Sequence, residues 1–152
     1  MKRLFSLLIL FLTVVSTEII SQSPEKDFVI VGIVSGDMNM VQIQMRYADA
    51  SNVYFIKESS AGGVEQIANA LEGLKINDLH IYTKSNGQEL FLTGLPINIG
   101  NMNDSAVQLK RWKKCVSGKV VIHVENNTTS PELNNLLLKL GELSELEFKL
   151  AR

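Results

Sequence analysis

The sequence is poor in cysteine, proline and aromatic residues. Among 152 residues there are one cysteine, three prolines and 7% aromatic side chains. A single cysteine excludes an internal disulfide bond, so we expect Cys115 to be buried or half-buried beside Val116 at the end of a helix. Stability must then come from an ordinary hydrophobic core.

The sequence also lacks an excess of charge of either sign. The formal net charge is -1 at pH 7. Proteins that bind nucleic acid normally carry a strong basic excess, so we expect no nucleic-acid partner. No phosphate-binding loop and no Gly-x-Ser-x-Gly elbow occurs, and we expect no cofactor.

Long apolar runs are absent. Residues 4–15 form a short apolar run after Lys2 and Arg3, whereas a spanning helix needs about 20 apolar residues. This pattern predicts a signal peptide over residues 1–21, cut near Ser21 or Ser23. The alternative is a retained N-terminal anchor. No cysteine follows the run to accept a lipid, so we expect a secreted or periplasmic product without stable membrane insertion after cleavage.

The remainder predicts one α/β domain. A short segment, 22–27, precedes a single domain over 28–152, and about 130 residues suit one core. Apolar runs or alternating patterns predict strands at 28–34, 52–56, 79–82, 119–124 and 146–150, with a small hairpin at 88–97. Residues 37–46 fit a helix or a strand, and a crossover helix is favoured because parallel neighbours need one.

Three further helices follow from apolar spacing. The first covers residues 63–71. The second runs from Asn101 to Gly118 with one apolar stripe, formed by Met102, Ala106, Leu109, Trp112 and Val116. The third begins with Ser130 as N-cap and Pro131, ends at Gly141 as a left-handed C-cap, and buries Leu133, Leu136, Leu137 and Leu140. The charged alternation after it predicts an edge strand.

Polar residues follow the predicted strands at their carboxyl ends, where open α/β sheets bind ligands. The candidate ligand rim comprises Asp37, Lys84, His123, Glu125 and Asn126. His80 and His123 are interpreted as sheet residues without a further ligand at metal spacing, and no metal is expected. The basic cluster of Lys110, Arg111, Lys113, Lys114 and Lys119 is interpreted as a solvated helix face, with an anionic surface or glycan as the alternative partner.

Three segments carry a family resemblance. Residues 63–71 (Gly-Val-Glu-Gln-Ile-Ala-Asn-Ala-Leu), then Leu79-His80-Ile81, then the hairpin exit at 94–99 with the following helix resemble the bacterial family described as domain of unknown function 4347. The resemblance covers roughly residues 28–150. It implies a fold similar to the caspase and gingipain group of cysteine peptidases, in large exported proteins.

The chain departs from that family where a catalytic pair would lie. Family members tend to follow the third strand with Ser-His-Gly and to end the fourth with Tyr-Gly-Cys. Here the corresponding segments are Thr83-Lys84-Ser85 and Ile122-His123-Val124. Because a cysteine nucleophile needs a thiolate and a neighbouring base, we expect no catalytic residues.

Two functional hypotheses remain. The first is a noncatalytic exported module, related to a peptidase-like domain and binding an unknown protein or glycan. The alternative is a hydrolase with an unrecognised active site at the rim. The expected fold is a three-layer sandwich with a mainly parallel five-stranded sheet, caspase-like or flavodoxin-like, plus the small hairpin.

Overall fold

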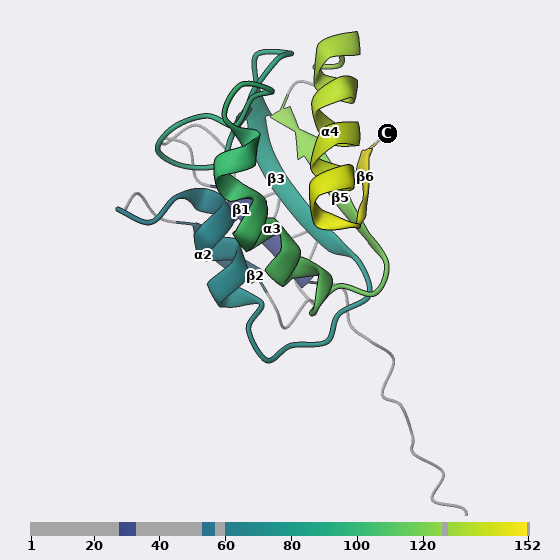
Figure 1. The fold of residues 1–152 in the computed structure, drawn as a ribbon. Helices are drawn as coiled ribbons and strands as arrows, with labels where there is room; N and C mark the ends of the chain where they lie inside the picture. Colours follow the sequence, from purple (N-terminus) through teal and green to yellow (C-terminus); the bar gives the residue numbers. More distant parts are fainter. Residues whose placement is uncertain (1–27, 33–52, 57–59, 126–127, 152) are drawn as a thin grey trace, which may run out of the picture.

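The fold is built on one mainly parallel β-sheet. The computed structural model describes residues 60–125 and 128–151 with strands 53–56 and 28–32, the last by its backbone alone. Strands lie in the order β2-β1-β3-β5-β6 with parallel neighbours, and β4 pairs antiparallel with β3 (Figure 1). They are β1 (Phe28–Gly32), β2 (Val53–Ile56), β3 (Leu79–Ser85), β4 (Leu90–Phe91), β5 (Lys119–Val124) and β6 (Glu147–Leu150). The predicted α/β class is confirmed.

One face of the sheet is covered by helices. These are α2 (Gly63–Ala70), α3 (Ala106–Lys113), which follows the 3-10 helix η1 (Met102–Ser105), and α4 (Pro131–Ser144) (Figure 1). Side chains alternate along a strand, so Leu79, Ile81, Val120 and Ile122 share this face. They form one core with buried side chains of all three helices, including Ile67, Leu109, Trp112, Leu133 and Leu136.

The start of α4 agrees with its predicted signals, but its end does not. Ser130 Oγ accepts a hydrogen bond from the Leu133 N–H at 2.9 Å, and Pro131 is the first helical residue. Gly141, predicted as the C-cap, instead lies inside the helix, and Glu145 adopts the left-handed conformation with φ 61°. A Cβ at Gly141 would lie 2.8 Å from the Leu146 carbonyl oxygen. The glycine therefore permits the chain to return closely over the helix.

Helix α3 is shorter than predicted. It ends at Lys113, whereas the apolar stripe indicated continuation to Gly118. The reason is that Val116 forms a parallel bridge with Ile76, and the Ile76 N–H donates to the Cys115 carbonyl at 2.9 Å. Cys115 thus lies after the helix, not on it, and is half-buried as predicted.

The predicted hairpin is a short one. Leu90 and Ile97 exchange two backbone hydrogen bonds of 2.9 Å, and Gly94 between them has φ 61°. β4 also pairs with the end of β3 through Lys84 opposite Phe91. This pairing extends β3 to Ser85, beyond the predicted end at residue 82.

β6 forms an edge of the sheet, as its alternating charges predicted. Lys149 and Glu147 project from it and form an ion pair of 2.9 Å. None of the helices in the described part of the chain has the length and apolar character to cross a membrane. The predicted crossover helix at residues 37–46 and the end of the first predicted strand lie outside the described residues.

Candidate functional site

The carboxyl ends of β3 and β5 form the lip at which the sequence predicted a ligand rim. Thr83 lies opposite Val124 in the parallel register, so Lys84 and Glu125 follow as neighbours. Lys84 Nζ lies 3.6 Å from Glu125 Oε2, with side chains 25% and 31% exposed. Such a partly solvated pair contributes at most about 1 kcal/mol. The structure therefore brings together two of the five predicted rim residues.

Hydroxyl groups around this lip are bonded to the backbone. Thr83 Oγ1 donates to the Phe91 carbonyl at 2.7 Å. Ser85 Oγ accepts from the Gly87 N–H at 3.0 Å, and Ser130 Oγ donates to the Gly87 carbonyl. These bonds brace the turn after β3 against the start of α4. A hydroxyl that acts as a nucleophile needs a bond to a general base instead.

His123 lies on the sheet face opposite the three helices. Its Nε2 lies 3.0 Å from Nδ1 of His80, and its ring stacks on Tyr82 with centroids 4.1 Å apart. A hydrogen bond between two imidazoles needs one protonated and one unprotonated nitrogen, so one of these two nitrogens donates and the other accepts. His123 is thus held by β3, as part of the sheet surface.

The pairing of the two histidines was missed from the sequence. Read separately, neither had a second histidine at ligand spacing. The parallel register places Tyr82 opposite His123. His80 lies two residues before Tyr82 and therefore on the same face of the sheet. Aligning the carboxyl ends of the two predicted strands would have paired Tyr82 with Val124 and moved His123 to the other sheet face, so only the observed register brings the imidazoles together. Within the described residues, no three His, Cys, Asp or Glu side chains gather as metal ligands.

The remaining rim residues cannot be placed. Asp37 and Asn126 lie outside the described residues. The rim that the structure describes therefore consists of Lys84, Glu125 and His123, which by strand alternation lie on the sheet face opposite the core.

Cys115 lies at the opposite edge of the sheet from the lip. It precedes β5, so it lies at the amino end of that strand, while Lys84 and Glu125 lie at the carboxyl ends of their strands. The half-buried thiol lines a surface hollow of about 310 Å³ together with Lys75, Arg111 and Lys114. A nucleophile for substrates bound at the lip would have to lie at the opposite end of β5.

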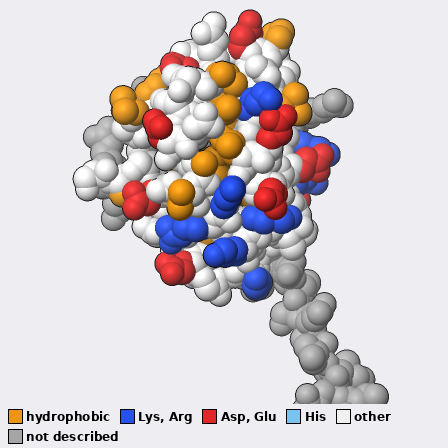
Figure 2. Space-filling view, in the orientation of Figure 1, with side chains coloured by type: hydrophobic (Ala, Val, Ile, Leu, Met, Phe, Trp, Pro, Cys, Tyr) orange, Lys and Arg blue, Asp and Glu red, His pale blue; other side chains and the backbone are white. Residues whose placement is uncertain are grey.

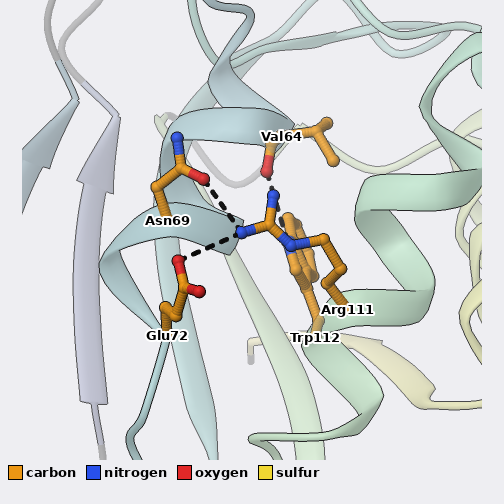
Figure 3. A network of polar contacts seen from close by, with 5 residues as sticks. All are labelled: Val64, Asn69, Glu72, Arg111 and Trp112. Atoms are coloured by element: carbon orange, nitrogen blue, oxygen red, sulfur yellow. Dashed lines mark hydrogen bonds and ion pairs between the residues drawn. The ribbon is translucent and has the colours of Figure 1, made fainter.

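Part of the basic cluster has a structural role. Arg111 Nη2 donates to Asn69 Oδ1 at 3.0 Å and lies 3.4 Å from Glu72 Oε2, while Trp112 Nε1 donates to the Val64 carbonyl at 3.2 Å (Figure 3). These contacts fasten α3 to α2. Figure 2 shows Lys and Arg side chains gathered in the lower part of this face, with Asp and Glu side chains at their margins. Arg111 is bound by Asn69 and Glu72, and Lys119 lies 3.4 Å from Asp78, so part of the cluster is paired within the chain.

Comparison with known proteins gives one family. No curated protein and no solved structure matches the chain significantly. The model of the family described as Domain of unknown function (DUF4347) matches residues 31–148, which include every described helix and the pairing of β3 with β5. Because this match spans most of the chain, the protein belongs to the DUF4347 family.

Proposed function

We propose that this protein is an exported, noncatalytic interaction module that binds a protein or a glycan. The observation that supports this proposal best is the Lys84–Glu125 ion pair of 3.6 Å at the lip. It occupies the strand ends where a peptidase-like relative would need an imidazole and a thiol. The hydroxyls of Thr83 and Ser130 are bound to backbone carbonyls there, which argues against a substitute nucleophile.

The proposal includes the finer architecture, a three-layer sandwich similar to caspase-like or flavodoxin-like folds. The chain passes from β1 to β2 in one direction across the sheet and from β2 to β3 in the other. Right-handed crossovers then require these two connections to lie on opposite faces. Helical secondary chemical shifts over residues 37–46 are expected, and extended shifts throughout would contradict the third layer.

An activity assay tests the noncatalytic role. The full-length chain is incubated with a fluorogenic peptide library, beside Cys115→Ser and Lys84→Met variants. We expect no turnover above buffer for any of them. Turnover lost in Cys115→Ser would indicate a cysteine peptidase, and turnover lost only in Lys84→Met would favour the alternative, a hydrolase with its site at the lip.

Export is tested separately. The apolar run at residues 4–15 after Lys2 and Arg3 motivates cleavage near residue 22. Intact mass of the extracellular or periplasmic product is expected to correspond to a chain that begins near Gln22 or Pro24. Recovery of only the full-length mass from the cytoplasm would contradict secretion.

A further inference from the structure

A pocket lined by residues other than those of the rim lies between the start of α2 and the segment that joins β4 to α3. Its volume is about 390 Å³, within the range of roughly 300–1,000 Å³ found for small-molecule sites. The residues that line it include Gly63, Glu65, Thr93, Leu95, Asp104 and Gln108. None of them belongs to the predicted rim.

Backbone donors at the start of α2 line this pocket. The N-cap residue is Gly62, whose extended backbone brings no side chain to cap the helix. The first N–H groups of a helix have no partner within it and carry partial positive charge. Gly63 presses against the neighbouring segment, since a Cβ there would lie 2.5 Å from Leu92 Cβ and 3.1 Å from the Thr93 nitrogen.

Two buried polar atoms beside these donors have no hydrogen-bond partner. Thr93 is 7% exposed and its Oγ1 is unpaired, and Gln108 Oε1 is buried and unpaired as well. Both residues line the pocket. Leaving a buried polar group unpaired is costly, so each such group calls for a partner. A ligand in the pocket can supply this hydrogen-bond partner if the Thr93 and Gln108 side chains rotate toward it.

The charges around the pocket define the ligand. Glu65 and Asp104 line it, and among the residues that the structure describes no lysine, arginine or histidine does. Two carboxylates repel an anion, while the helix start offers donors and Gln108 offers an acceptor. An uncharged group that both donates and accepts hydrogen bonds satisfies all of these partners. Leu95, 84% exposed at the mouth, adds an apolar surface.

We propose that this pocket binds an uncharged saccharide. Hydroxyl groups of the sugar accept from the first N–H groups of α2 and bond with the Thr93 hydroxyl. Other hydroxyls donate to Gln108 Oε1 and the two carboxylates, and the C–H face of the ring contacts Leu95. The residues that line this pocket are not those of the lip, so the proposed binding does not depend on whether the lip is catalytic.

Titration of the isotope-labelled full-length chain tests the assignment. Maltose, lactose, cellobiose and chitobiose are the probes, and inorganic phosphate and glycine are the charged comparisons. We expect at least one disaccharide to shift the amide signals of Val64, Glu65 and Thr93 in a saturable manner. Phosphate and glycine are expected to leave these signals unchanged.

Three variants identify the pocket. Thr93→Val and Leu95→Ala should each weaken disaccharide binding about fivefold, the loss expected for one contact of about 1 kcal/mol. Leu138→Ala, the same change at an exposed leucine on α4, should bind as the parent chain does. Leu95 is on the surface, so its variant remains informative even where Thr93→Val alters folding.

Three results would overturn the assignment. The first is no saturable shift with any of the four disaccharides. The second is a response of the same amides to phosphate or glycine at lower concentration than to any sugar. The third is disaccharide binding that neither Thr93→Val nor Leu95→Ala weakens.

Discussion

Two buried threonines differ in whether the hydroxyl has a partner. Thr83 Oγ1 donates to the Phe91 carbonyl at 2.7 Å, whereas Thr93 Oγ1 has no partner. Valine has nearly the same shape as threonine without the hydroxyl. We expect Thr83→Val to lower the free energy of unfolding by about 1–3 kcal/mol, because the Phe91 carbonyl loses a bond. Thr93→Val should leave it unchanged or raise it by up to ~1 kcal/mol.

Urea denaturation of the two variants measures this difference. The same substitution serves as its own control, since only the partner of the hydroxyl differs. Equal destabilisation by both variants would mean that Thr93 Oγ1 is satisfied in solution, for example by water. That outcome would also remove one support for the saccharide pocket.

Glu145 carries backbone strain at the end of α4. It is the one non-glycine residue with positive φ among the described residues, at 61°. Glycine adopts this conformation freely, so Glu145→Gly should raise the free energy of unfolding by about 0.5–1 kcal/mol. Glu142→Gly, within α4, should lower it by a similar amount. Thermal unfolding of both variants measures whether their stabilities change in opposite directions. A loss of stability in Glu145→Gly would contradict backbone strain at this residue.

At the residue scale, the sequence predicted roles that depend on neighbouring residues better than roles that depend on contacts between distant elements. Ser130 as a cap follows from local preference alone and is confirmed. Gly141 was misplaced because its role depends on the return of Leu146 over the helix, a contact between elements. The pairing of His80 with His123 likewise requires the register of two strands far apart in the chain.

Helix α4 shows how strongly apolar spacing determines burial. Leu137 faces the core at 3% exposure, while its neighbour Leu138 is 68% exposed. Leu137→Ala should lower the free energy of unfolding by about 2–5 kcal/mol, because it removes buried contacts and leaves a cavity. Leu138→Ala should change it by less than about 0.5 kcal/mol. Chemical denaturation of this pair tests the stripe, and a change below about 0.5 kcal/mol for Leu137→Ala would place it on the surface.

At the element scale, the sequence predicted local segments well and their ends less well. The strand at residues 119–124 has the predicted bounds. The apolar stripe predicted α3 to continue to Val116. Val116 is indeed buried, but it forms a β-bridge with Ile76 and is not helical. Helical and bridged residues can face the same core, so periodicity alone cannot separate them.

Among the described strands, the inner ones have two neighbours in the sheet and the outer ones have one. β3 lies between β1 and β5, whereas β2 and β6 each have one neighbour on the sheet path. Amide hydrogens with partners on a fully flanked strand exchange only through larger opening events. We expect the slowest exchange in β3 and β5 and the fastest among the strands at the β6 edge. Mass spectrometry of exchanged peptides measures this order, and faster exchange in β3 than in β6 would contradict the topology.

At the scale of the molecule, alternating elements predicted the α/β class but not the order of strands. The continuous apolar run of the first strand is typical of an interior strand of a parallel sheet, and β1 does lie inside the sheet, but the run does not indicate that its neighbours are β2 and β3. That arrangement results from packing of whole elements. The predicted lip is nonetheless placed at adjacent strand ends, because the carboxyl ends of parallel neighbours meet at one edge.

The position of β1 inside the sheet also governs the timing of folding. β1 is synthesised first, yet both of its neighbours follow later, so its two edges stay open until β2 and then β3 have been made. Parallel pairs close only through long crossovers, and such non-local closure is slow. A polypeptide that is exported in the unfolded state must be threaded through a narrow channel before it collapses. In the proposed exported precursor, late closure of the sheet would keep the chain threadable until β3 has passed through.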